Sequence, residues 1–404
     1  MLGHLMTIAH ASSDTAGPAD TPLRWTASWA AAAQPYGVQP AAARLPPAPA
    51  GVLDHQTLRV RLTPGLDGER VRFRFSNVFG RKPLHIAAAS LAHSGEGDAL
   101  QDSSAQPLRF GKKSDITIAP GAQTWSDAID FKANANEPIS VSLYLDRASP
   151  YATVFTLSQE QVWSASGNAT LKSAWTAASA MPLGHVLTGM DVARSAPAPV
   201  VVTFGDSITL AYQDHLGTRL REEWGSGAPA AVIKAGIAGN RLLANWIGPK
   251  GMERFGRDVL AQSGVSHAIV LLGINDIGFS TSDQWLPTPG APTQAQLSDG
   301  LQRLVAQANA KGVKIVLGTL PPFKGAAYWS IEKEGRRQAL NAWIRGRGDV
   351  AGIADFDLVL RDPKDPLKLR AVYDNGDHLH PNAAGGRAMA QAIPLNEPPR
   401  LARN

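Results

Sequence analysis

The chain has 404 residues, which is long for one core at about 150 residues per domain, so we expect two domains. Its formal net charge of +5 is small for this length, and no dense block of Lys and Arg occurs, so nucleic-acid binding is not expected. No apolar run approaches the roughly 18 residues that a membrane-spanning helix needs, and the lack of cysteine excludes disulfides, thiolate catalysis and thiolate metal sites.

The first 24 residues carry a weak indication of export. The stretch "MLGHLMTIAHA" ends in the small-x-small pattern of a signal-peptidase site, although it is short and lacks a basic n-region. We interpret residues 1–24 as a flexible N-terminus or the remnant of a leader. A secreted or periplasmic location is the expectation.

Residues 25–196 have the pattern of an all-β domain. The stretches "TLRVRL" and "RVRFRFSNVF" alternate apolar and charged residues with period 2, and "ITIAP" and "PISVSLYL" repeat the pattern between turn-rich pieces. Several short strands at this spacing predict a β-sandwich or jelly roll. The Pro-containing stretch "RSAPAPV", residues 194–200, marks a domain boundary near residue 196.

Residues 197–404 combine apolar strands with helical stretches such as "LSDGLQRLVAQANAKG", which closes with a glycine suited to a C-cap. Strands that are apolar on both faces indicate a parallel sheet covered by helices, and such sheets bind ligands beyond the carboxyl ends of their strands. The expected strands lie at 200–204, 230–236, 267–273 and 313–320.

Ser207 follows the first of these strands in "VVTFGDSITLAYQ", at a sharp strand-to-helix turn. In isolation, Asp206 or Ser207 could simply cap the next helix. Candidate partners follow other strands: Gly236 and Gly239 in "GIAGNRL", Asn275 in "GINDIG", and, near the C-terminus, Asp377 and His380 in "DNGDHLHPN".

Together these residues supply the parts of an acyl-transfer site. They offer a hydroxyl nucleophile, an imidazole base, a carboxylate that orients the imidazole, and donors for an oxyanion. The Asp-x-x-His spacing lets Asp377 accept from Nδ1–H of His380 while Nε2 faces Ser207. Neutral Asn275 suits an oxyanion hole, because it donates without a charge that would capture the carboxylate product.

From Val200 to near Ile393 the sequence resembles the SGNH hydrolases, also called the GDSL esterase/lipase superfamily. "GDSIT", "GIAGN", "GIND" and "DHLHPN" are similar to four of its sequence blocks. The resemblance implies an α/β fold with a three-layer, flavodoxin-like, doubly wound parallel sheet. It makes Ser207, His380 and Asp377 the catalytic triad, and the N–H groups of Ser207 and Gly239 with the Asn275 side chain the oxyanion hole.

One difference from the family pattern is visible, because Leu210 and Ala211 follow "GDSIT" where a pair such as "DG" is expected. The chain has no G-x-S-x-G elbow, which disfavours the larger α/β-hydrolase fold. His378 lies between the triad candidates, but the family spacing selects His380.

Neighbouring polar residues have simpler interpretations. Asp276 is expected to be a cap or structural acceptor, and Asn240 to support the Gly239 turn. His215 and His267 stand alone, and no H-E-x-x-H or thiol cluster occurs, so no metal or other cofactor is predicted.

Aromatic residues in the predicted rim loops are candidates for substrate contact, although packing under long loops would also explain them. They are Trp246, Trp285, Tyr328 and Trp329.

The leading hypothesis is a serine esterase that removes short acyl groups, acetyl above all, from plant-type polysaccharide. The layout resembles GDSL-type acetylxylan esterases with an added β-domain, a likeness at the level of the fold. A lipase or arylesterase with the same catalytic residues is the alternative. A glycan-binding protein with an inactive hydrolase domain is a further one. The sequence does not indicate the oligomeric state.

Overall fold

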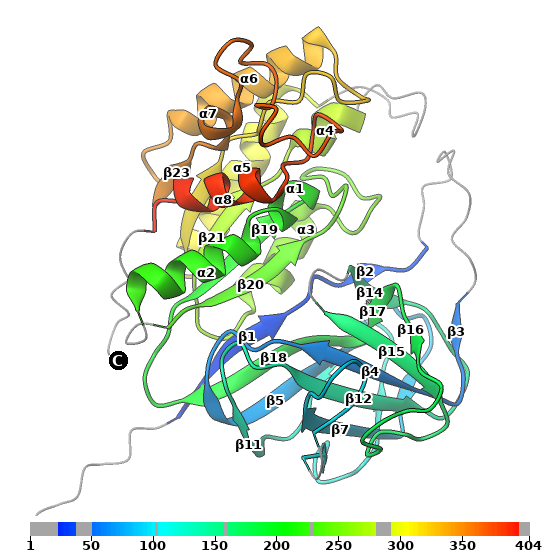
Figure 1. Cartoon of the computed structure of the whole chain (residues 1–404). Coiled ribbons are helices and arrows are strands. Elements are labelled where there is room, and N and C mark those ends of the chain that lie inside the picture. The colour runs from blue at the N-terminus through cyan, green and yellow to red at the C-terminus, as the bar shows by residue number, and fades with distance from the viewer. Residues whose placement is uncertain are drawn as a thin grey trace, which may run out of the picture.

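The structure is a computed structural model that describes two regions of different architecture (Figure 1). Strands β1 to β18 are antiparallel, and from Val200 onward the strands β19 to β23 are parallel. The change falls between Arg194 and Val200, so the predicted boundary near residue 196 lies in the connecting segment. The described residues are 23–37, 51–101, 104–156, 160–225, 229–279 and 292–395. Nearly all of the predicted N-terminal segment 1–24 lies outside them.

The N-terminal region contains two main antiparallel sheets. The first has β1 (Arg24–Ala30), β18 (Leu187–Arg194), β5 (Gly68–Ser76), β10 (Gln123–Trp125) and β11 (Ile129–Ala133). The second has β16 (Ser179–Ala180), β15 (Gln161–Ser166), β4 (Gln56–Leu62), β12 (Ile139–Leu145), β7 (Ala88–His93) and β8 (Gln106–Pro107). Smaller sheets join β17 (Leu183–His185), β14 (Thr153–Thr156) and β2 (Gln34–Pro35), then β13 (Ser149–Pro150) with β3 (Val52–Leu53), and β6 (Leu84–Ile86) with β9 (Ile116–Ile118).

Alternation of side chains explains the core of this β-domain. In β5, Val71, Phe73 and Phe75 are fully buried, as are Leu58 and Val60 of β4. Successive side chains of a strand point to opposite faces, so one apolar face of each sheet can enter the core. The N-terminal region is thus an all-β domain with two main sheets, as predicted for a sandwich or jelly roll.

One charged residue of the alternating pattern is not on the surface. Arg59 of β4 is fully buried because loop residues cover the outer face of its sheet. Its guanidinium donates to the carbonyl oxygens of Asp98 and Lys172 at 2.6 and 2.8 Å, and it lies 4.2 Å from the ring centre of Trp175. A buried cation is tolerated here because its donors are satisfied.

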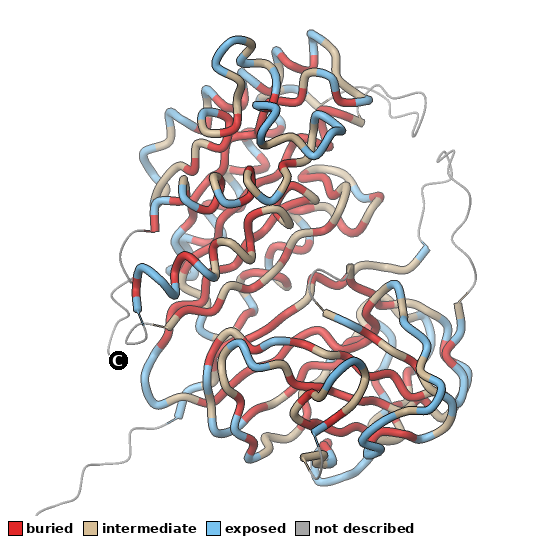
Figure 2. The backbone as a smooth tube through the Cα atoms, viewed as in Figure 1, coloured by how far each residue is buried: buried red, intermediate tan, exposed pale blue. Residues whose placement is uncertain are grey.

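The C-terminal region is built on a five-stranded parallel sheet in the order β20-β19-β21-β22-β23. This is the flavodoxin-like order 2-1-3-4-5, so the predicted fold class is confirmed. Figure 2 shows the central strands buried along most of their length, as expected for a sheet with helices on both faces. The strands are β19 (Val200–Gly205), β20 (Ala231–Gly236), β21 (Val265–Leu271), β22 (Lys314–Gly318) and β23 (Gly352–Ala354).

The helices form two packed groups about this sheet. Helix α2 packs on α8 and α8 on α7, whereas α5 packs on α3 and α6 (Figure 1). Helix α5 begins with a capping box formed by Thr293 and Gln296, and after it the chain turns at Gly312, whose φ is +69°. The helices are α1 (Ser207–Leu210), α2 (Gln213–Trp224), α3 (Gly251–Phe255), the π-helix η1 (Gly256–Leu260), α4 (Ile274–Gly278), α5 (Gln294–Asn309), α6 (Ile331–Arg345), α7 (Phe356–Leu360) and α8 (Ala383–Ala392). Throughout the described ranges, every helix is too short or too polar to span a membrane.

The two regions contact each other directly through β1 and the segment around η1. The Ala27 N–H donates to the carbonyl oxygen of Ser263 at 2.8 Å, and the Ser263 hydroxyl donates to Asp191 of β18 at 2.7 Å. The Arg257 guanidinium of η1 donates to the carbonyl oxygen of Ala33 at 2.7 Å. These bonds fix the β-domain against the α/β domain near the elements that support the site described next.

Candidate active site

Ser207 lies at the first position of α1, immediately after β19. Its neighbour Asp206 is the N-cap, and one oxygen of the Asp206 carboxyl accepts from the Ile208 N–H at 3.0 Å. The turn requires Gly205, because a Cβ there would lie 2.4 Å from the carbonyl oxygen of Leu271. Since Asp206 caps the helix, the Ser207 hydroxyl is free for another role.

That hydroxyl belongs to a hydrogen-bonded chain of three side chains. Oγ of Ser207 lies 2.7 Å from Nε2 of His380, and Nδ1 of His380 lies 2.5 Å from Oδ2 of Asp377. The other oxygen of Asp377 accepts from the backbone N–H groups of Leu379 and His380 at 3.0 and 2.8 Å. The structure thus brings the three predicted residues together in the order of a Ser-His-Asp triad.

The environment of Asp377 keeps it ionised. Burial alone would raise the pKa of its carboxyl, but the hydrogen bonds from the His380 side chain and from the two backbone N–H groups outweigh burial and lower it. A carboxylate held in this way fixes the ring orientation of His380 and stabilises the positive charge that the ring gains on taking a proton.

His378 belongs to a different pair. Its backbone has a φ of +61°, and its Nδ1 lies 2.6 Å from Oδ2 of Asp374. The ring lies against the backbone of Gly325, where a Cβ would come 2.9 Å from the ring. His378 is therefore directed to Asp374, whereas His380 is directed to Ser207, as expected from the spacing.

The predicted oxyanion donors lie on adjoining turns. Gly239 has a φ of +70°, and a Cβ there would come 2.5 Å from the Ile247 side chain, so the turn needs glycine. The Asn275 side-chain amide donates to the carbonyl oxygen of Asn240 at 3.1 Å, which places it beside the Gly239 turn. A primary amide has two N–H donors, so this bond leaves Asn275 one donor for an oxyanion.

Asn240 and Asp276 support these turns, as predicted. The Asn240 amide donates to the carbonyl oxygens of Ile247 and Pro249, both at 2.9 Å. Asp276 accepts from the backbone N–H groups of Leu242 and Leu243 at 2.7 and 2.9 Å. Burial raises the pKa of Asp276 to about 6. Asp276 thus ties the chain after the Gly239 turn to the helix that carries Asn275.

The sequence analysis missed Arg254. Its side chain connects the turn that carries Ser207 to the turn that carries Gly239. The buried guanidinium donates to the carbonyl oxygens of Gly205 and Ala235 at 2.7 and 2.8 Å, to Oδ1 of Asn240 at 2.9 Å, and to Asp258 at 3.1 Å. Burial lowers its pKa to about 10, so it stays charged at neutral pH. The one available signal was the Arg-Asp pair at i and i+4 beside a glycine-rich turn.

The predicted rim aromatics have different environments. Trp246 is only 6% exposed and packs edge-to-face on Phe279, with ring centres 5.1 Å apart. Phe279 packs in the same manner on Tyr328 at 5.3 Å, and the Tyr328 hydroxyl donates to Oδ1 of Asn275 at 3.4 Å. Trp329 is half-buried, and Trp285 lies outside the described residues. Tyr328 is thus the predicted aromatic residue that contacts a candidate oxyanion donor.

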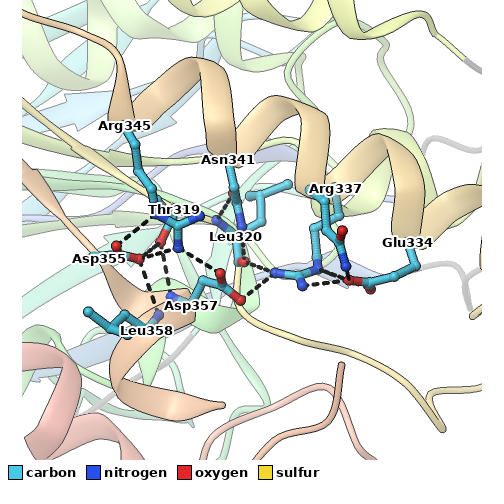
Figure 3. Close-up of polar contacts among 10 residues, drawn as sticks. Thr319, Leu320, Glu334, Arg337, Asn341, Arg345, Asp355, Asp357 and Leu358 are labelled. Atoms are coloured by element: carbon cyan, nitrogen blue, oxygen red, sulfur yellow. Dashed lines mark hydrogen bonds and ion pairs between the residues drawn. The ribbon is translucent and has the colours of Figure 1, made fainter. Parts of the chain in front are cut away.

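A polar network anchors the loop that carries Tyr328 (Figure 3). The backbone of Leu320, at the start of this loop, donates to and accepts from the Asn341 side chain at 2.7 and 2.8 Å. Arg337 also donates to the Leu320 carbonyl oxygen at 2.7 Å and pairs with Glu334 and Asp357, both of them buried. Every charge in this buried group has an opposite partner, which is the condition for retaining charges in a core.

A metal-dependent reaction was not predicted. Within the described ranges there is no cluster of three or more His, Cys, Asp or Glu side chains arranged to hold a metal ion.

The fold and the Ser-His-Asp arrangement resemble those of the SGNH hydrolases. Residues 203–388 match the model of the GDSL-like Lipase/Acylhydrolase family. None of the curated proteins compared with the chain matches it.

Several solved structures are similar to about half of the chain. A GDSL-like lipase from Bacteroides thetaiotaomicron is 19% identical, covers 48% of this chain and 84% of its own, and has a TM-score of 0.36. An acetyl xylan esterase is 20% identical over 48% of this chain and 96% of its own, with a TM-score of 0.37. A catalytic mutant of an acetylxylan esterase from Geobacillus stearothermophilus is 17% identical over 49% and 93%, with a TM-score of 0.39.

Proposed function

We propose that this protein is a serine esterase that hydrolyses short-chain acyl esters, acetyl above all, on plant-type polysaccharides. The observation that carries the proposal is the 2.7 Å contact between Oγ of Ser207 and Nε2 of His380, with His380 in turn held by Asp377. A hydroxyl in contact with an imidazole that is oriented by a carboxylate is the arrangement that activates serine for acyl transfer.

In the proposed reaction, His380 takes the proton of Ser207 as its Oγ attacks the ester carbonyl carbon. The resulting oxyanion would accept from the backbone N–H groups of Ser207 and Gly239 and from the Asn275 amide. Collapse of this intermediate expels the alcohol, which takes the proton from His380, and leaves an acyl-enzyme. Water, deprotonated by His380, then attacks the acyl carbon, the bond to Ser207 Oγ breaks, and Oγ takes the proton back from His380 as the acid is released.

The preference for a short acyl group is supported by the surroundings of Asn275. The Tyr328 ring lies against Gly278, where a Cβ would come 2.5 Å from the ring, and against Phe279. This packed aromatic group adjoins a proposed oxyanion donor and would form one wall of the acyl pocket. Flat rings and a phenol hydroxyl also suit a sugar, which has apolar faces and a hydroxyl rim.

The test compares p-nitrophenyl esters of increasing chain length and measures acetate released from acetylated polysaccharides. We expect acetate to be cleaved far faster than octanoate, and acetate to be released from at least one acetylated glycan. Ser207→Ala should lower kcat by a factor on the order of 10⁶. Ser173→Ala, at an exposed serine of the β-domain, is the matched control and should leave kcat unchanged.

Two results would contradict parts of the proposal. Ser207→Ala activity within tenfold of the wild type would remove Ser207 as the nucleophile. A chain-length profile that peaks at octanoate or longer, with no acetate released from any acetylated glycan, would favour a lipase.

A further inference from the structure

A pocket in the β-domain is lined by the end of β2 and by the segment that leads into β14. Figure 1 shows where these two strands lie. The pocket's volume of about 620 Å³ is within the range of about 300–1,000 Å³ that is typical of small-molecule sites. Residues 35–37, 79–84 and 147–152 with Asn77 form its walls. No residue of the candidate active site lines it, so the pocket is a separate feature of the molecule.

One wall of the pocket is aromatic and held in place. The rings of Tyr36 and Tyr151 meet edge-to-face, with centres 5.1 Å apart and planes at 80°. Gly51 passes so close to Tyr151 that a Cβ would lie 2.1 Å from the ring, and the His185 ring centre lies 4.3 Å from that of Tyr151. Packed on several sides, the Tyr151 ring is preorganised, which reduces the entropy that a ligand must lose on binding.

The pocket lining also carries cationic side chains. Arg81, Lys82 and Arg147 are exposed lining residues, and the lining contains no Asp or Glu. Arg147 pairs with neighbouring Asp146 at 3.1 Å, whereas neither Arg81 nor Lys82 has an ion-pair partner among the described residues. A guanidinium and an ammonium in one pocket lining favour an anionic ligand, and the planar guanidinium suits a carboxylate in particular.

A small recess of about 20 Å³ adjoins the pocket and shares Asn77, Ser149 and Tyr151 with it. His185 lines this recess, is only 2% exposed, and its Nε2 has no hydrogen-bond partner in the described part of the chain. Burial lowers the pKa of His185 to about 4, so the ring is neutral at pH 7. A recess of this size holds one water molecule or one ligand hydroxyl, either of which would satisfy the ring nitrogen.

We propose that this pocket binds a uronate unit of an acidic polysaccharide. The carboxylate pairs with Arg81 and Lys82, and the apolar face of the sugar ring lies on the aromatic wall. The pocket itself indicates a ligand that carries a ring and a negative charge. The choice of a sugar over another anionic ring compound rests on the proposed function.

The position of the pocket suits a polymer that also reaches the esterase domain. Phe79, which lines the pocket, lies with its ring centre 5.2 Å from the Arg257 guanidinium of η1. The pocket therefore borders the α/β domain, so one polysaccharide chain can contact both domains.

Isothermal titration calorimetry on the full wild-type chain tests this proposal. The probes are trigalacturonate, which carries no ester, xylotriose as an uncharged sugar, and AMP as an anionic ring compound that is not a uronate. We expect trigalacturonate to bind more tightly than either, and Arg81→Ala combined with Lys82→Ala to weaken it about tenfold or more, because charge-assisted hydrogen bonds are lost. Lys132→Ala, at an exposed lysine of β11, is the matched control and should leave binding unchanged.

Tyr151→Leu provides a second variant and should weaken trigalacturonate binding through loss of the aromatic wall. Equal binding by the wild type and the Arg81/Lys82 double variant, or equal binding of xylotriose and trigalacturonate, would overturn the proposal. Tighter binding of AMP would overturn the assignment to a sugar. Hydrolysis of p-nitrophenyl acetate, measured on the same preparation, separates this proposal from the esterase proposal. Binding without hydrolysis would contradict only the esterase, and hydrolysis without binding only the pocket.

Discussion

The Arg254 guanidinium donates to the carbonyl oxygen of Gly205 at 2.7 Å, two residues before Ser207 in the chain. The same guanidinium donates to the Asn240 side chain at 2.9 Å, directly after Gly239. One buried cation thus joins the turn that carries the proposed nucleophile to the turn that carries a proposed oxyanion donor. Their relative position depends on a side chain that need not touch substrate.

Arg254→Lys tests this positioning role. Lysine keeps the charge but cannot reproduce the planar fork, so at least one of the buried acceptors on Gly205, Ala235 and Asn240 loses its donor. An unsatisfied buried group costs about 1–3 kcal/mol, so we expect the free energy of unfolding to fall by about that amount. We also expect kcat for p-nitrophenyl acetate to fall more than KM rises.

Denaturant unfolding and steady-state kinetics check both effects of Arg254→Lys. Arg221→Lys, at an exposed arginine of α2, is the control and should change neither quantity. If Arg254→Lys matched the wild type in stability and in kcat, the proposed link between the two turns would be wrong.

Asn275→Ala should lower kcat by roughly 10² to 10³ with a smaller effect on KM. The reason is that the amide donor matters most when negative charge develops on the carbonyl oxygen. Tyr328→Phe is the comparison, because it removes the hydroxyl that donates to Oδ1 of Asn275 at 3.4 Å but leaves the amide N–H groups in place. A raised KM with an unchanged kcat in Asn275→Ala would make Asn275 a residue that binds the ground state.

The sequence predicted those parts of the fold that have a local pattern. Alternation in β5 indicated the sandwich or jelly roll, and mostly apolar runs in β19 and β21 indicated the parallel sheet, because burial of one face or of both faces leaves a recognisable pattern. Strands of two or three residues, such as β2 and β23, are too short to show a period. Arg59 looked like a surface residue because the loops that cover it are distant in sequence.

In the candidate site too, residues marked by a local sequence pattern could be predicted, and residues whose roles depend on distant contacts could not. Ser207 and Asn275 could be predicted because each lies within a few residues of the end of a strand of the parallel sheet. His380 could be predicted because of its spacing from Asp377. Arg254 and Phe279 acquire their roles from contacts with residues far away in sequence. No short motif encodes such contacts.

Asp206 should make stability depend on pH. Burial raises the pKa of its carboxyl from 3.8 to about 7, and one of its oxygens has no hydrogen-bond partner within the described structure. A carboxyl whose pKa rises on folding contributes stability that is fully present below the unfolded pKa and is lost as pH rises through the folded value. The contribution of Asp206 therefore declines between about pH 4 and pH 7.

Asp206→Asn tests this dependence, because asparagine also caps helices and resembles the protonated acid. We expect the melting temperature of the wild type, relative to that of Asp206→Asn, to fall by several degrees between pH 5 and pH 8, since each pKa unit is worth about 1.4 kcal/mol. Asp130→Asn, at a side chain that is 88% exposed, is the control. A melting-temperature difference that stays constant with pH would show that Asp206 does not titrate in this range.

His380→Ala and His378→Ala form a matched pair, because the two residues are neighbours in one loop and each is hydrogen-bonded to an aspartate, at 2.5 and 2.6 Å. Only His380 also contacts Ser207 Oγ, so His380→Ala should be nearly inactive, whereas His378→Ala should keep most of the wild-type kcat. Hydrolysis of p-nitrophenyl acetate measures the rates, and circular dichroism shows whether both variants fold. Because His378 has a φ of +61°, His378→Ala costs some stability, and a lower melting temperature with a retained kcat is the expected combination. The opposite pattern, with His378→Ala inactive and His380→Ala active, would make the pair of His378 with Asp374 the base of the reaction and remove Asp377 from the triad.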